Sequence, residues 1–144
     1  MHPKTTDELL KVLNGISSVQ ELHTYTEATS TQTPAKTFDA YMAECMAAKG
    51  LSASELIHKA QIQRTYGYQI LNGTKNPGRD KVIALCLALS LTLVETQRAL
   101  TLAKEGILYP KCRRDSVIIF SINKGFSVLE TNELLYNVEE PLLD

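Results

Sequence analysis

Few residues of this chain have the types and spacing that catalysis or metal binding requires. The histidines are His2, His23 and His58, and none has a cysteine or carboxylate at metal-ligand spacing. The sequence contains no glycine-rich phosphate loop, no nucleophile elbow and no HExxH motif. We therefore expect no enzymatic activity, no catalytic residues, no cofactor and no metal site.

The residue types of this chain are better suited to hydrogen bonding than to catalysis or metal binding. Polar side chains are closely spaced between residues 64 and 75: Arg64, Thr65, Tyr66, Tyr68, Gln69, Asn72, Thr74 and Lys75. An arginine fork holds two acceptors at once, and a glutamine amide offers a donor and an acceptor side by side. These groups can recognise a partner only if a rigid element holds them outward.

Three capping boxes predict where helices begin. A Ser or Thr followed three residues later by Glu satisfies two free N–H groups of a helix start. The pairs are Ser52–Glu55, Thr92–Glu95 and Ser127–Glu130, and each opens a run with apolar residues at helical spacing. Strand signals are weak, so we predict an all-α fold.

Glycine and proline predict where the helices end. A helix from about Phe38 to Lys49 is expected to end at Gly50, and a second helical run at Gly73, before an Asn-Pro-Gly loop at residues 76–78. A third run is expected to end at Gly106, and a fourth to extend from Pro110 to Gly125.

The N-terminal part of the chain differs from the rest. Residues 6–14 and 18–28 predict two short helices of an arm, and residues 29–36 predict a polar linker.

The segment 51–77, LSASELIHKAQIQRTYGYQILNGTKNP, predicts two short helices joined by a tight turn. The first runs from Ala53 to Lys59 or Ala60, and the second from Arg64 to Leu71 or Asn72. Leu56, Ile62 and Ile70 give the two helices a shared apolar face. This arrangement is the helix-turn-helix plan.

The segment resembles the Cro-type (XRE) helix-turn-helix family of phage and bacterial repressors. The residues that carry the resemblance are Leu51-Ser52, Glu55-Leu56, Ile62, Arg64, Ile70, Gly73 and Asn76-Pro77, all without a gap, and residues 81–89 match the fourth helix of the family. It covers about half the chain, from Phe38 to Leu100. It implies a lambda-repressor-like domain of five helices.

In that family the second helix of the motif enters the DNA major groove. Carried over by position, the predicted base contacts are Arg64, Thr65, Tyr68 and Gln69, and the predicted DNA backbone contacts are Ser52, Tyr66, Asn72, Thr74 and Lys75. Arginine can hold guanine O6 and N7 together, and glutamine can hold adenine N6 and N7.

Four positions depart from the family pattern, and one of them is Ala53, where many relatives have glutamine. The family usually has a small residue where this chain has Ile57, glycine where it has Gln61, and Ile or Val where it has Gly67. Residues 57 and 67 face each other in the motif, so we expect Ile57 to fill the space that Gly67 leaves. We expect Gln61 to adopt a left-handed conformation. Of Tyr66 and Tyr68, one should pack on the core beside Gly67 and the other should be exposed.

A repeat with an offset of 35 residues relates helices 4 and 5 of the predicted domain to the C-terminal part of the chain. Residues 79–83 (RDKVI) resemble residues 114–118 (RDSVI). Residues 92–96 (TLVET) resemble residues 127–131 (SVLET) in the same way. We therefore predict that a C-terminal helical hairpin repeats helices 4 and 5 and packs on them. The predicted domains are residues 1–36, 37–106 and 107–144.

Charge is nearly balanced overall but unevenly distributed. The chain has 15 basic and 16 acidic residues, so it is not a strongly basic polyanion binder. Residues 37–91 carry a net charge of +2, whereas residues 126–144 carry −5. The acidic tail is more typical of a solvated helix face than of a shield against phosphates. Arg113 and Arg114, next to Asp115, are expected on a helix surface.

The cysteines and the apolar runs bear on location. Cys45, Cys86 and Cys112 include no CxxC pair and lie in apolar helical contexts, so we expect three buried free thiols in a reducing compartment. The sequence shows no secretory signal pattern and no apolar run of about 20 residues. We predict a cytoplasmic protein with no membrane association.

Two functions fit these observations. The first is sequence-specific binding of double-stranded DNA as a bacterial or phage-type transcriptional regulator, with a possible homodimer through the C-terminal hairpin. The apolar residues behind that dimer are Ile118, Ile119, Phe120, Leu134, Leu135, Leu142 and Leu143. The alternative is a non-catalytic module that keeps the repressor fold but binds a protein partner through this hairpin or the N-terminal arm.

Overall fold

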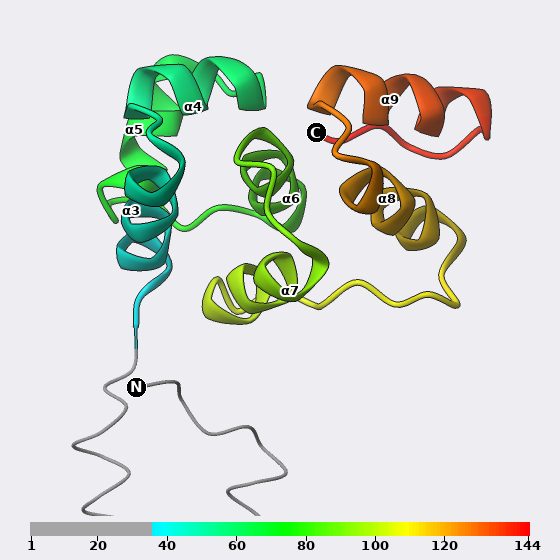
Figure 1. Ribbon diagram of the computed structural model, residues 1–144, viewed down its shortest axis with the longest axis horizontal. Coiled ribbons are helices and arrows are strands. Elements are labelled where there is room, and N and C mark those ends of the chain that lie inside the picture. Colours follow the sequence, from blue (N-terminus) through cyan, green and yellow to red (C-terminus); the bar gives the residue numbers. More distant parts are fainter. Residues whose placement is uncertain (1–35) are drawn as a thin grey trace, which may run out of the picture. The chain divides into compact units, whose positions relative to one another are not determined.

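The computed structural model describes residues 36–144, which form seven α-helices and no strand (Figure 1). The helices are α3 (Phe38–Lys49), α4 (Ala53–Ala60), α5 (Arg64–Leu71), α6 (Arg79–Ala88), α7 (Leu93–Leu102), α8 (Arg113–Lys124) and α9 (Val128–Asn137). The all-α prediction is confirmed for these residues. The predicted arm helices and nearly all of the linker lie outside them.

The predicted helix starts are formed by side-chain caps. Ser52, Thr92 and Ser127 each accept a hydrogen bond from the backbone N–H three residues on, and the glutamate at that position accepts from the cap residue's own N–H. Gly50 and Gly125 end α3 and α8 in the left-handed conformation, as predicted. Gly106 was wrongly predicted to end α7. That helix ends at Leu102, and the chain turns at Lys104, whose φ is 60°.

Helix α6 lies at the centre of the described part of the chain. It contacts α4, α7 and α9, and in Figure 1 α4 and α9 lie on opposite sides of it with α7 below. Val82, Ile83, Leu85 and Cys86 are fully buried. A helix that is apolar all round must be covered on every side. It therefore joins the predicted helix-turn-helix segment to the C-terminal hairpin.

The C-terminal hairpin α8–α9 repeats α6–α7 and packs against it, as the 35-residue offset predicted. Helix α9 contacts α6, and α8 contacts α7. The backbone conformation also repeats. Ser90 and Lys104, which follow α6 and α7, have positive φ, and so do the residues 35 positions later, Gly125 and Glu139, which follow α8 and α9.

Two surface expectations are corrected. Cys45 and Cys86 are buried, but Cys112 is exposed because it is the residue preceding α8 rather than part of its apolar face. Arg113 is exposed as predicted, whereas the Arg114 side chain is mostly buried and paired with Asp80. No helix within residues 36–144 is long and apolar enough to cross a membrane.

Candidate nucleic-acid interface

Helices α4 and α5 meet through a tight turn at residues 61–63. Gln61 takes the left-handed conformation, with φ 56° and ψ 41°, as predicted from its departure from glycine. The N–H of Ile62 then donates to the carbonyl of Ile57 at 3.2 Å. The predicted shared apolar face is present, since Leu56, Ile62 and Ile70 are all buried. The turn thereby fixes the angle at which α5 leaves α4.

Ile57 and Gly67 form the contact that holds the two helices close together. A Cβ added to Gly67 would lie 2.7 Å from Cγ1, 2.8 Å from Cγ2 and 3.0 Å from Cδ1 of Ile57. These distances leave no room for a methyl group. Ile57 therefore fills the space beside Gly67, as expected.

The start of α5 is capped by Gln63, which the sequence did not predict as a cap. The Gln63 side chain accepts a hydrogen bond from the N–H of Tyr66 at 2.8 Å. Glutamine is not among the usual capping residues, so its position before Arg64 gave no signal. The cap anchors the first turn of α5, which carries Arg64 and Thr65.

Arg64, Thr65 and Tyr68 form an exposed edge of α5. The Arg64 guanidinium lies 5.7 Å from the centroid of the Tyr68 ring, one helical turn away. Such stacking is a cation–π contact, and it orients the arginine along the helix surface. Tyr66 is half-buried and packs against the core, so the predicted division between the two tyrosines is confirmed. Its side chain is correspondingly less available than those of Arg64 and Tyr68.

The remaining predicted contact residues of this segment lie at the end of α5 or just after it. Gln69 is partly buried, and its backbone carbonyl accepts from the N–H groups of Thr74 and Lys75 at 2.9 and 3.1 Å. The Asn72 side chain also accepts from the Thr74 N–H, at 2.9 Å. Asn72, Thr74 and Lys75 are all exposed. The exit is thus an ordered turn that holds these three side chains in solvent.

Ser52 lies on the other helix of the motif and is exposed at the start of α4. Its hydroxyl accepts from the N–H of Glu55 at 3.1 Å, and its own N–H donates to the Glu55 carboxylate at 3.3 Å. The Ser52 hydroxyl and the Ser52 backbone N–H, as hydrogen-bond donors to the Glu55 carboxylate, lower the pKa of Glu55. A negative charge therefore stays beside Ser52 at neutral pH.

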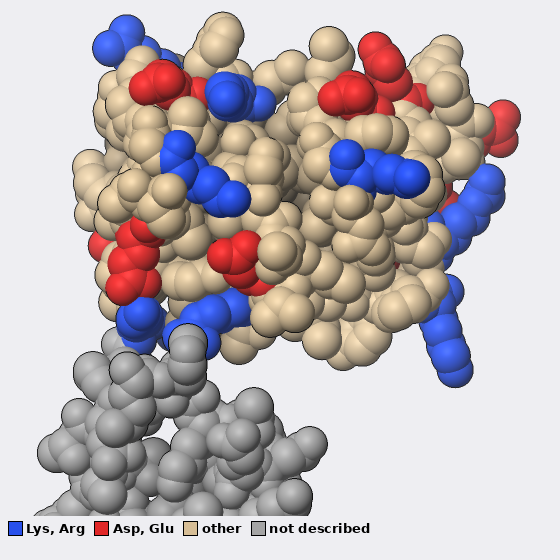
Figure 2. Space-filling model, viewed as in Figure 1, with Lys and Arg blue, Asp and Glu red and all other residues tan. Residues whose placement is uncertain are grey.

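The charges around α5 are mixed. Lys59, Arg64 and Lys75 are exposed. Against them, Asp39 of α3 lies beneath the helix exit, where its Oδ2 is 3.0 Å from the position a Cβ would take on Gly73. On the face drawn in Figure 2, basic and acidic side chains are interspersed. The basic side chains of this region accordingly lie near the ends of α4 and α5.

Within residues 36–144, no three His, Cys, Asp or Glu side chains lie close enough together to hold a metal ion. In comparisons with known proteins, no family model, curated protein or solved structure matches this chain.

Proposed function

We propose that this protein binds double-stranded DNA through α5 and acts as a bacterial or phage-type transcriptional regulator of the Cro (XRE) kind. In this proposal α3 to α7 form a lambda-repressor-like domain. Helix α5 enters the major groove, and α4 crosses the sugar–phosphate backbone.

The observation that carries the proposal is the exposed edge of α5 on a rigid pair of helices. The Gln61 turn, the Gln63 cap and the Ile57–Gly67 contact fix α5 relative to α4. Arg64 and Tyr68 then point away from the core on one surface. A short helix that projects in this way fits a groove about 12 Å wide.

The proposed contacts divide by chemistry. Arg64, Thr65, Tyr68 and Gln69 would read base edges, with Arg64 suited to guanine and Gln69 to adenine. Ser52, Tyr66, Asn72, Thr74 and Lys75 would contact the sugar–phosphate backbone. Of these, Lys75 alone carries a full positive charge, so it should contribute most to the salt dependence.

The test is a titration of the full chain with labelled duplexes that carry a randomised centre, at about 50 mM and about 200 mM salt. Duplexes enriched by selection then serve for the variants. Arg64→Ala should weaken binding to the selected duplex by about 5- to 150-fold, the range of one bidentate base contact. Lys75→Ala should weaken all duplexes alike and make the log–log salt slope shallower by about 0.9.

Arg98→Ala is a matched control for Arg64. Arg98 is also exposed, and its guanidinium lies 5.6 Å from the Tyr41 ring, so the same charge and the same kind of stacking are removed from α7. Lys111, exposed before α8, is the control for Lys75. Absence of duplex binding at low salt contradicts the proposal. Equal losses in Arg64→Ala and Arg98→Ala contradict the assignment of α5 to the groove.

The alternative, a non-catalytic module that binds a protein partner, is favoured by the apolar residues left exposed on the C-terminal hairpin. Leu129, Tyr136 and Leu142 are 56%, 74% and 44% exposed. Substituting Leu129 and Tyr136 by serine should leave duplex binding unchanged if DNA is the partner. Failure of the unaltered chain to bind DNA at any salt concentration would favour this alternative.

The dimer expected through the C-terminal hairpin remains a prediction, and fewer of the apolar residues named for it are accessible to a partner. Ile118 and Leu135 are fully buried within the chain and are not available to a partner. Phe120, at 47% exposed, and Leu142 are the residues of that set that remain most accessible.

A further inference from the structure

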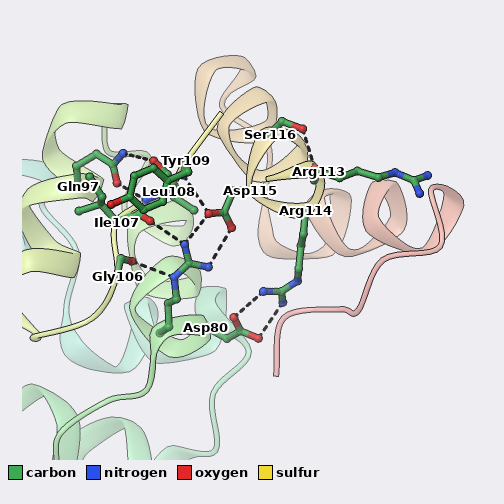
Figure 3. Close-up of polar contacts among 11 residues, drawn as sticks. Asp80, Gln97, Gly106, Ile107, Leu108, Tyr109, Arg113, Arg114, Asp115 and Ser116 are labelled. Atoms are coloured by element: carbon green, nitrogen blue, oxygen red, sulfur yellow. Dashed lines mark hydrogen bonds and ion pairs between the residues drawn. The ribbon is translucent and has the colours of Figure 1, made fainter. Parts of the chain in front are cut away.

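Arg79, at the start of α6, joins two segments that follow it in the chain. Its guanidinium donates to both carboxylate oxygens of Asp115, at 3.0 and 2.8 Å, and to the carbonyls of Gly106 and Ile107, at 2.9 and 3.0 Å (Figure 3). Asp115 also accepts from the N–H of Tyr109 at 3.0 Å. The carboxylate is almost fully buried, so all of its partners come from the protein.

Arg114, at the start of α8, makes the same set of contacts with the two hairpins exchanged. It donates to both carboxylate oxygens of Asp80, at 3.1 and 2.9 Å (Figure 3). It also donates to the carbonyls of Pro141 and Leu142, at 2.9 and 3.1 Å, and Asp80 accepts from the N–H of Asp144 at 3.1 Å. Every group in this set stands 35 residues from its counterpart around Arg79.

This exchange shows that a local twofold relation, not a translation, connects the two hairpins. In a translated stack, Arg79 would pair with Asp115, and Arg114 would need a third hairpin. Here Arg114 pairs back to Asp80, and the helices agree, because α6 contacts α9 while α7 contacts α8. In such an isologous interface each half presents the same surface to the other.

Buried side chains match in the same way. Ile83 corresponds to Ile118 and Leu100 to Leu135, and all four are fully buried. Leu85 and Phe120 do not match, since the first is fully buried and the second is 47% exposed. Helix α6 is covered by α4, whereas no helix of residues 36–144 covers α8 in the equivalent way. The two hairpins are therefore alike where they face each other.

We infer that the face of α6–α7 beneath α8–α9 is a self-association face, which binds the same face of a second copy of this chain when its own α8–α9 hairpin leaves it. Arg79 of each chain then pairs with Asp80 of the other. The N–H of Tyr109 reaches that same Asp80, as it now reaches Asp115. The C-terminal hairpin is thus an internal competitor for the dimer.

Connection length and space both agree with this inference. Only Pro110, Lys111 and Cys112 separate Tyr109 from α8. A connection that short gives docking within one chain an effective concentration of about millimolar or more, so the unaltered chain stays closed at micromolar concentration. Helices α3 to α5 lie on the opposite side of α6–α7 from α8–α9 (Figure 1), so they do not occupy the place of the second copy.

The experiment is to exchange the charges on α8 in the full chain, as R114D/D115R. Arg79 then faces an arginine at position 115, and Asp80 faces an aspartate at position 114, so like charges repel the hairpin. Arg79 and Asp80 themselves are unchanged and remain available to a second copy of the chain. Light scattering over a concentration series should give the mass of one chain for the unaltered protein and of two for the variant. Hydrogen exchange should become fast in α8 and α9 but not in α3 to α6.

Two further variants make the result decisive. Adding Arg79→Ala to R114D/D115R removes both cross-chain pairs and should return the mass to one chain. Arg113→Asp changes an exposed charge on the same helix and should leave a single chain. If hydrogen exchange shows α8–α9 still docked, Ile118→Asp is added, which places a charge at a fully buried position of the hairpin.

The inference is overturned by a released hairpin with the mass of one chain at every concentration. It is overturned equally by a dimer that survives the loss of Arg79, and by assemblies larger than two, because a twofold face closes at the dimer.

Discussion

The contact between Ile57 and Gly67 gives the sharpest quantitative prediction of this structure. Alanine is favoured over glycine inside a helix by about 1 kcal/mol, so Gly67→Ala would ordinarily stabilise α5. Here the added Cβ would lie within 3.0 Å of three Ile57 atoms. Overpacking of this kind costs about 1–3 kcal/mol. We therefore expect Gly67→Ala to lower the free energy of unfolding, by about 1 kcal/mol after the propensity gain is subtracted.

The sign should reverse when Ile57 is shortened. Ile57→Ala alone should destabilise by about 2–5 kcal/mol, because it removes a buried side chain and leaves a cavity beside Gly67. In that background Gly67→Ala meets no clash, since all three contacting atoms are gone, and should stabilise by about 1 kcal/mol. The two changes are thus coupled by about 2 kcal/mol.

The assay is urea unfolding of the four proteins of this double-mutant cycle, followed by circular dichroism. The further double variant Ile57→Ala with Gly67→Val, which exchanges the two volumes, should be more stable than Ile57→Ala alone. The reasoning would be refuted by additive effects, or by a Gly67→Ala protein more stable than the unaltered one. Either result would mean that α4 and α5 are not held at the separation described.

Three further predictions concern stability and reactivity. Gln61→Gly should raise the free energy of unfolding by up to about 1 kcal/mol, measured by urea titration, because glycine adopts the left-handed turn without strain; a loss of stability would contradict this. Burial raises the pKa values of Asp80 and Asp115, but hydrogen bonds from Arg114 and Arg79 and from backbone N–H groups outweigh it, so both pKa values are lowered. The stabilisation that these two carboxylates provide is therefore complete above the unfolded-state pKa of about 4 and is lost as the pH falls through the folded-state pKa values. D80N/D115N should lower Tm at neutral pH and should make Tm depend less on pH in the acid range, as measured by thermal unfolding over a pH series. In a thiol-reagent assay of the folded protein only Cys112 should react quickly, because Cys45 and Cys86 are buried and burial raises the pKa of Cys86 to about 12; all three should react after unfolding.

The helix starts could be predicted because their causes lie within four residues. Ser52, Thr92 and Ser127 carry their capping partner in the sequence itself. The end of α7 could not be predicted in this way. Lys104 turns the chain there with a positive φ, although lysine gives no signal for that conformation. Gly106, two residues on, was instead expected to end the helix because glycine usually marks such turns.

The sequence predicted the two helices of the candidate site and their closest contact, but not every hydrogen bond that holds them. The Ile57–Gly67 contact was expected from two departures from the pattern of the resembled family, and the structure confirms that Ile57 fills the space beside Gly67. The Gln63 cap was missed because its residue type is not typical of caps.

The pairing of the two hairpins could not have been found from the repeat alone. A period of 35 residues states that two hairpins are alike, but it does not distinguish translation from rotation. Arg114 was accordingly expected on the surface, and only the three-dimensional contacts show that it returns to Asp80. Partners separated by 34 residues leave no mark in local periodicity.

The stacking of Arg64 on Tyr68 affects the entropy of any encounter at α5. A free arginine side chain loses about 2 kcal/mol of rotamer freedom when a ligand immobilises it. Here the tyrosine ring has already restricted the guanidinium before any ligand arrives. If α5 binds DNA as proposed, Tyr68 would contribute to affinity by holding Arg64 in place, so Tyr68→Ala would weaken binding even where the ring itself touches no DNA.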